Sequence, residues 1–313
     1  MPAPYTPLIV LGLFLLSGCA GYANRIREAR NNFEAGQYDL AVEQIKVLAD
    51  KKDNDVILYL LDLGIVYHTA GRYEEAIKIF LEAEKITQIK DYTNIAQETA
   101  TVILYEDVKE YRIEYFEHVL INIYLAIDFT MLKKYESALV ECRKVNHKID
   151  RLIREGKLPL EHNAFAKYLA AALFETEREL NDAFVDYRTT LKWAAKFPYL
   201  PQPLLRIADK LQFTQEYAEF KKLFPTVTDY KLGKNEGEVI LLLEVGKAPL
   251  KIPRPDFTLV PMFVRNRGYS VENAVLKDGS GKFRAPSYTL FDVEETAIKE
   301  LNDKMAGLVA KKI

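Results

Sequence analysis

A repeating arrangement of small and large side chains is the feature that most constrains the fold of this chain. Its clearest copy comprises Leu63, Gly64, Tyr67, Gly71, Tyr73, Ala76, Phe80 and Ala83. Small residues at such positions let two helices approach closely, large residues fill the space between them, and Gly71 suits the tight turn that joins them. The pattern therefore predicts antiparallel helix pairs that stack side by side.

The same unit recurs between residues 23 and 224, a region poor in Gly and Pro with apolar residues at i, i+3, i+4 and i+7. Tyr38 precedes Tyr73 by 35 residues, close to the period of about 34 residues that is typical of tetratricopeptide (TPR) repeats. Weaker copies lie at 125–138, 170–183 and 204–224. The sequence thus predicts an irregular, TPR-like array.

The spacing between copies also predicts an insertion. Tyr135 follows Tyr73 by 62 residues, which places an additional segment near residues 87–115. This segment is rich in aromatic residues, namely Tyr92, Tyr105, Tyr111, Tyr115 and Phe116. They could anchor a partner or form the apolar side of an amphipathic helix.

The composition and apolar pattern of the sequence change after Pro225. Val239–Val245 is an apolar run interrupted only by Glu244, apt for a buried strand. Three prolines within 249–255 exclude a helix there. Further short strands are expected at Phe257–Val264, Ala274–Leu276 and Ser287–Phe291, with a hairpin turn at Asp278–Gly281 and a final helix from about Val293 to Lys312. We expect a mainly α fold: a TPR-like antiparallel helix-pair array over 19–225 and a small C-terminal β-containing (α+β) module over 226–313.

The beginning of the chain carries a motif of its own. Leu16-Ser17-Gly18-Cys19 directly follows an apolar stretch and resembles the lipobox of bacterial lipoproteins. The resemblance implies that residues 1–18 are a signal peptide, that Cys19 becomes lipidated (diacylglycerol on the sulfur, an acyl group such as palmitate on the amine), and that the protein is anchored at the periplasmic face of the outer membrane. The apolar run is shorter than the roughly 20 residues of a membrane span, as a cleaved signal should be. Residues 1–7 contain no Lys or Arg, and an ordinary secretory signal or a buried apolar strand remains the alternative.

A second resemblance covers most of the chain after Cys19. It is carried by Tyr115-Phe116-Glu117-His118, Tyr124-Leu125-Ala126, Asp128-Phe129, Tyr135, Ala138, Val140–Asn146, Gly237–Ile240 and Gly246–Pro249. These motifs are similar to a family of uncharacterised Gram-negative TPR-like repeat lipoproteins. The resemblance implies a lipid-anchored envelope protein without known catalysis, whose relatives tend to be encoded near activator lipoproteins of peptidoglycan synthases. From the same resemblance we expect the last helix to continue beyond Ile313.

Composition and motifs exclude several classes of function. A net charge of −2 does not suit a nucleic-acid partner, which would require a basic face. With Cys19 lipidated, Cys142 is the remaining thiol, so no internal disulfide is expected. The 4 histidines lie too far apart for a zinc-like pair, and we find no P-loop, nucleophile elbow or dinucleotide fingerprint. The sequence thus predicts no enzymatic activity, no metal and no cofactor other than the covalent lipid.

A candidate partner-binding groove follows from the repeat geometry, since stacked repeats present a concave face. The first helices of two units would turn toward it Leu58, Leu61, Ile65, His68, Thr69, Leu120, Ile123, Ile127, Thr130 and Met131. These residues suit an apolar peptide or helix, unless the insertion or the C-terminal module covers the groove. Interaction sites or structural ion pairs are expected at Tyr115, Glu117, Glu141 and Arg143.

The sequence therefore predicts a lipid-anchored, non-enzymatic interaction scaffold of the bacterial envelope with a protein partner in the groove. Two alternatives stay open. One is a regulator of peptidoglycan synthesis or envelope assembly, and the other is a peptidoglycan-binding or hydrolytic protein that uses its C-terminal module.

Overall fold

The structure is a computed structural model that describes the chain except for residues 1–20, 96–112, 156–162, 229–230, 254, 256–260, 267–273, 282 and 311–313. The lipidation prediction at Cys19 and most of the expected insertion lie outside the described residues. The chain divides into two compact units, one with the helices up to residue 95 and one with the described residues from 113 onward.

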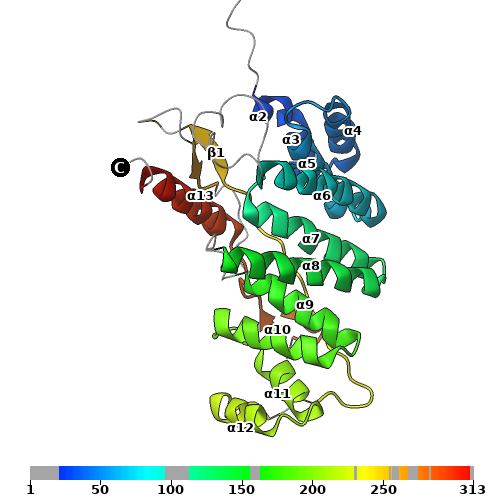
Figure 1. Ribbon diagram of the computed structural model, residues 1–313. Coiled ribbons are helices and arrows are strands. Elements are labelled where there is room, and N and C mark those ends of the chain that lie inside the picture. Colours follow the sequence, from blue (N-terminus) through cyan, green and yellow to red (C-terminus); the bar gives the residue numbers. More distant parts are fainter. Residues whose placement is uncertain are drawn as a thin grey trace, which may run out of the picture. The chain divides into compact units, whose positions relative to one another are not determined.

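The first unit contains two antiparallel helix pairs preceded by a short helix. Its elements are α2 (Tyr22–Arg25), α3 (Arg27–Glu34), α4 (Tyr38–Ala49), α5 (Val56–Thr69) and α6 (Tyr73–Ile95). Helix α3 packs on α4, α4 on α5, and α5 on α6 (Figure 1). Gly64 faces the buried ring of Phe80 across the α5–α6 pair, which is the close approach that the sequence predicts.

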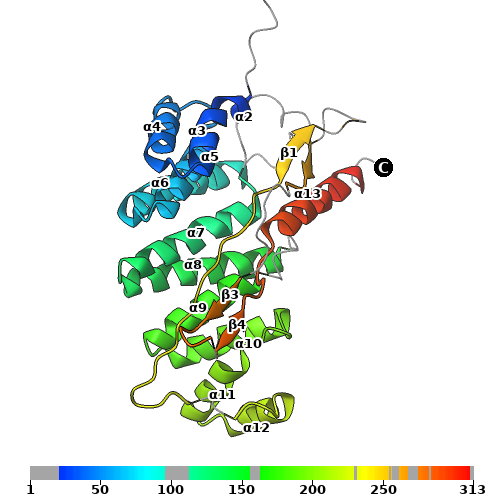
Figure 2. The ribbon, with the colours of Figure 1, turned by 180° about the vertical axis from the view of Figure 1, so that it is seen from behind.

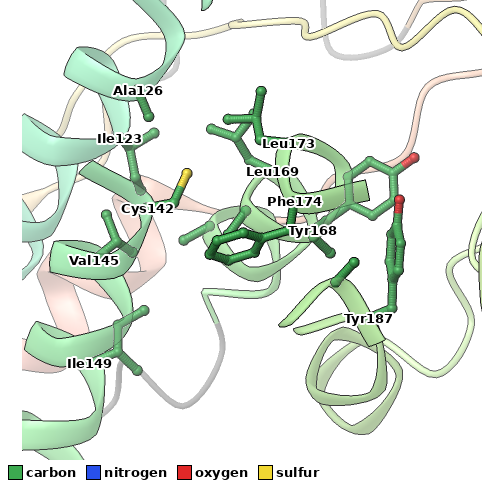
Figure 3. Packing of buried hydrophobic residues seen from close by; sticks show 14 of the residues in the cluster. Ile123, Ala126, Cys142, Val145, Ile149, Tyr168, Leu169, Leu173, Phe174 and Tyr187 are labelled. Carbon is green, nitrogen blue, oxygen red and sulfur yellow. The ribbon is translucent and has the colours of Figure 1, made fainter. Parts of the chain in front are cut away.

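The second unit contains three further pairs. Its helices are α7 (Tyr115–Met131), α8 (Tyr135–Arg154), α9 (Ala164–Thr176), α10 (Leu180–Trp193), α11 (Pro201–Lys210) and α12 (Thr214–Leu223). Successive helices pack side by side from α7 to α12, and the pairs share one core. Figure 3 shows Cys142 in that core, beside Ile123, Ala126 and Val145.

One turn geometry closes all five pairs of the described chain. The residue that ends each turn donates its backbone N–H to the carbonyl five residues earlier, as from Arg72 to Tyr67 and from Lys134 to Phe129. The residue before it has a positive φ, and these residues are Gly36, Gly71, Lys133, Arg178 and Gln212. This is the left-handed helix ending that glycine adopts most easily. Its recurrence confirms a mainly α, TPR-like repeat fold from the chain's own geometry.

The C-terminal residues form two small antiparallel ribbons and a helix. β1 (Leu250–Pro253) pairs with β2 (Pro261–Val264), β3 (Val275–Lys277) pairs with β4 (Arg284–Pro286), and α13 (Val293–Ala310) follows. Asp278–Gly281 lies in the turn between β3 and β4, as predicted. The strand prediction for Ser287–Phe291 is wrong, because the ribbon uses the residues just before it.

These C-terminal residues pack both with one another, as α13 does on β2, and with the helices of their unit. Residues 113–313 belong to one compact unit, and Leu242, Phe263, Leu290 and Val293 each pack against the helical core. The chain before β1 and the β3–β4 ribbon lie over the helices of their own unit (Figure 2), whereas α13 packs on β2 and at the start of α7. Two ribbons of three and four residues are too small to enclose a core of their own.

Candidate interaction surface of the second unit

An extended stretch of chain crosses the first helices of the three pairs in this unit. Residues Glu238–Glu244, here named the crossing segment, run from α11 past α9 to α7 (Figure 2). The segment pairs with no strand among the described residues. The face formed by α7, α9 and α11 therefore holds a length of polypeptide that is extended in the manner of a bound peptide.

The α11 end of the crossing segment is anchored by a buried arginine. Arg206 is only 4% exposed, and its guanidinium donates to Glu175 of α9, with Nε 2.6 Å from Oε1 and Nη2 2.9 Å from Oε2. The same Nη2 lies 2.9 Å from Oε2 of Glu238. A guanidinium buried to this degree requires carboxylate partners, and one of the two comes from the crossing segment.

The α7 end is anchored by a phenol. Tyr124 donates its hydroxyl to Oε2 of Glu244 over 2.9 Å. Burial, and then the negative charge of Glu244, raise the pKa of Tyr124 well above its ordinary value. The hydroxyl therefore stays protonated and remains a hydrogen-bond donor toward the carboxylate.

Between the two anchors a single side chain reaches the core. Leu242 is half-buried and packs against the apolar cluster of the helices. Val239 is 80%, Ile240 42% and Leu241 60% exposed, and Leu243 and Val245 are exposed as well. The prediction of a buried strand at Val239–Val245 is therefore wrong. The run is extended as its β-branched and apolar residues favour, but it lies on helices and leaves most of its apolar side chains exposed to solvent.

A cluster of charged groups lies at the N-terminus of α7. Both carboxylate oxygens of Glu300, on α13, accept backbone N–H groups of α7, from Tyr115 at 2.7 Å and Phe116 at 3.1 Å. Glu114 and Glu117 form a capping box at the same end, with the Glu114 N–H 2.8 Å from Oε2 of Glu117. Carboxylates are favourable there because the first N–H groups of a helix have no partners within it.

Two lysines pair with the carboxylates of Glu114 and Glu300. Lys251 of β1 lies 3.1 Å from Glu114, while Lys304 of α13 contacts Glu114 and lies 3.0 Å from Glu300. Burial opposes ionisation of Glu114, but Lys304 and Lys251 outweigh it, and the pKa of Glu114 lies below its ordinary value. Burial likewise opposes the charge on Lys304, yet Glu114 and Glu300 raise its pKa to about 12. The cluster is thus an ion-paired clamp that joins α7, β1 and α13.

The predicted groove residues fall into two sets. On α5, Leu58, Leu61, Ile65 and His68 are half-buried and Thr69 is exposed. On α7, Ile123 and Ile127 are buried in the core, Leu120 packs against it, Thr130 is half-buried and Met131 is exposed. Ile123 and Ile127 therefore help to hold the helices together, and Tyr124 beside them contacts the crossing segment.

The predicted polar residues take part in contacts within the unit. Glu117 completes the capping box of α7, and the ring of Tyr115 lies 4.7 Å from the Lys304 ammonium. Glu141 is buried and accepts from Asn122 over 2.6 Å. Arg143 pairs with Glu179 and lies over the ring of Phe174. These contacts give all four residues structural partners.

The sequence did not identify Arg206, Tyr124 or Glu238 as site residues. Arg206 had a detectable signal, because it is a lone charge within the apolar stretch Pro203–Ala208 of a predicted helix. Tyr124 lies on the same helical stripe as Leu120, Ile127 and Met131, at spacings of i, i+4, i+7 and i+11. Glu238 opens an apolar run and carries no signal by itself.

Two further properties concern the described part of the chain. No cluster of three or more His, Cys, Asp or Glu side chains is arranged there to hold a metal ion. None of its helices combines the length and apolar character needed to cross a membrane.

The helix pairs and their shared turn define a TPR-like repeat fold, which is typical of protein–protein interaction scaffolds. No family model matches the chain, and no curated protein matches it significantly. Among solved structures, MamA from Desulfovibrio magneticus RS-1 is 16% identical, with 66% of this chain and 96% of that chain covered and a TM-score of 0.43. A tetratricopeptide repeat protein from Parabacteroides merdae is 17% identical, with coverages of 65% and 66% and a TM-score of 0.43. At such values neither likeness says anything about activity.

Proposed function

We propose that this protein is a lipid-anchored, non-enzymatic interaction scaffold at the periplasmic face of the bacterial outer membrane. The lipobox-like Leu16–Cys19 supports the anchor and the compartment. The repeat fold supports a scaffold, because stacked helix pairs offer long surfaces to protein partners.

One observation carries the choice of binding surface. The face of α7, α9 and α11 already holds an extended chain through a buried arginine, a phenol and a partly buried leucine. A surface that satisfies an extended chain in this way has the chemistry that peptide recognition requires. The proposed partner is an envelope protein that presents such a chain.

The test is partner capture on the lipidated protein in cells. In-cell crosslinking and mass spectrometry would compare the wild type with Cys19→Ser, which cannot receive the diacylglycerol. We expect an envelope protein that is recovered with the wild type and lost with Cys19→Ser. Recovery of no envelope protein with the wild type would contradict the scaffold function, and equal recovery with both would contradict the role of the anchor.

A role in regulating peptidoglycan synthesis or envelope assembly is a narrower form of this proposal, and the identity of the captured protein decides it. The other alternative is a peptidoglycan-binding or hydrolytic module after residue 225. The described residues there pack along the helices, so no observation favours that alternative. Cosedimentation of the protein with purified peptidoglycan, or release of soluble fragments from it, would support it.

A further inference from the structure

We propose that the crossing segment occupies a peptide-binding site as an internal ligand, and that a partner's peptide replaces it. The site takes an extended peptide with two carboxylate side chains six residues apart and an apolar side chain between them. This inference rests on the proposed scaffold function and adds the chemistry of the partner.

The geometry requires an extended ligand. The crossing segment is extended from Glu238, at its anchor on α11, to Glu244, at its anchor on α7. Six residues of extended chain span about 20 Å, whereas six residues of helix span about 9 Å. A helical peptide with carboxylates at the same sequence spacing therefore could not reach both anchors.

Charge complementarity fixes the ends of the ligand. Arg206 is buried and shares one nitrogen between Glu175 and Glu238, so departure of Glu238 leaves a position that a new carboxylate would fill. Tyr124 offers a hydroxyl that burial keeps protonated. A carboxylate at each end suits both donors, and a Lys or Arg side chain beside Arg206 would be repelled.

The internal ligand is held weakly enough to exchange. Val239 and Leu241 are 80% and 60% exposed, and of the apolar side chains between the two anchors only Leu242 packs on the core. Among the described residues, no backbone hydrogen bond joins Val239–Leu243 to another segment. Segments with few buried contacts and solvent-exposed backbone open at a small fraction of the global unfolding free energy.

The experiment uses the full chain, purified in detergent, and a fluorescent synthetic peptide with the sequence of residues 236–247. Leu242→Asp should release the crossing segment, and Leu241→Asp is the matched control because Leu241 points to solvent. The apparent Kd for a site falls as the fraction of open sites rises. We expect Leu242→Asp to bind the peptide at least about tenfold more tightly than Leu241→Asp or the wild type.

Two further measurements keep the test decisive. The chain carrying both Glu238→Gln and Glu244→Gln weakens the anchors without changing apolar burial, and it should also bind the peptide more tightly than the wild type. A peptide with both glutamates replaced by glutamine should bind the Leu242→Asp chain at least about tenfold more weakly than the original peptide, a loss of about 1.4 kcal/mol or more. Equal binding by all folded variants, or equal binding of the two peptides, would overturn the proposal. Concentration-dependent dimerisation of the chain without peptide uptake would overturn it as well, since the exposed segment would then serve a second copy.

The peptide-binding experiment and the partner-capture experiment test different claims and can give different results. Capture of an envelope protein together with failure of peptide binding would retain the scaffold function and move the partner to another surface. Peptide binding without any captured partner would retain the site and reject the scaffold function in cells.

Discussion

Replacement of Glu300 by alanine tests whether α13 stabilises the helical array by capping α7. Glu300 is 2% exposed and accepts two N–H groups of α7. Hydrogen bonds to a charged group contribute about 1.5–3 kcal/mol, and loss of a helix cap costs about 0.5–2 kcal/mol. Removal of the buried carboxylate relieves its desolvation, which offsets part of that loss. We therefore expect Glu300→Ala to lower the free energy of unfolding of this unit by about 2–4 kcal/mol.

The assay is urea unfolding followed by the fluorescence of Trp193. It is the single tryptophan of the chain, and it lies on α10 of the same unit. Glu295→Ala is the matched control, because Glu295 lies on the same helix with its side chain 59% exposed and pairs only at the surface with Arg265. Its loss should cost less than about 1 kcal/mol. Equal effects of the two substitutions, or unchanged hydrogen exchange at the Tyr115 and Phe116 amides of Glu300→Ala, would refute the capping argument.

Three further predictions concern other parts of the chain. A Cβ added at Gly64 would lie 2.5 Å from Cε1 of Phe80, so Gly64→Ala should cost about 1–2 kcal/mol in urea unfolding despite its gain in helix propensity. The double variant Gly64→Ala/Phe80→Leu should lose less free energy of unfolding than the two single variants lose in sum. The pKa of Glu114 is lowered, so the stability it contributes is present above the unfolded pKa of about 4.3 and is lost as pH falls through the folded pKa. The difference in urea midpoint between the wild type and Glu114→Gln should therefore shrink from pH 7 to pH 3, and a constant difference would contradict the ion-paired clamp. Burial raises the pKa of Cys142, so in a Cys19→Ser chain a maleimide should react with it only after unfolding, and rapid reaction with the native chain would show that the thiol is accessible.

The repeat architecture could be predicted from sequence because its signal is local. Gly64 and Phe80 lie 16 residues apart, and Gly71 marks the turn between their helices. The later turns at Lys133 and Arg178 adopt the same left-handed geometry without glycine. There the prediction depended on the side chains that follow each turn, such as Tyr135, which keep the repeat pattern.

The surroundings of the C-terminal residues could not be predicted in the same way. The run Val239–Val245 correctly indicates extended chain, but hydrophobicity alone does not say whether a sheet, a helical face or solvent will lie against it. The caps of α7 show the limit most clearly, since Tyr115 and Glu300 are 185 residues apart. No periodicity in the sequence connects such positions.

On α7, the groove prediction named Leu120, Ile127 and Met131, which share a stripe with Tyr124, but it did not name Tyr124 itself. Consecutive helical residues differ by about 100° in direction, so a choice of Ile123 over Tyr124 exchanges a core residue for one that contacts the crossing segment. Apolar character favoured Ile123, because a groove for an apolar peptide was expected. The face of α7, α9 and α11 has polar anchors at its two ends. Of these, Arg206 could have been found from the sequence as an isolated charged residue in an apolar helix.

These contacts make the C-terminal third and the helical array of the second unit mutually dependent. Glu238, Glu244 and Lys251 tie consecutive parts of the C-terminal chain to α11 and α7, and Glu300 returns to cap α7 itself. A chain that ends at residue 225 would leave the guanidinium of Arg206 with Glu175 as its remaining carboxylate among those described, and the first N–H groups of α7 without Glu300. Because uncompensated buried charge and uncapped helix ends both lower stability, residues 226–313 contribute to the fold of the array as well as to the occupation of its groove. Exchange of the crossing segment for a partner's peptide can then occur without loss of the array, since the clamp formed by Glu114, Lys251, Glu300 and Lys304 lies outside Glu238–Glu244.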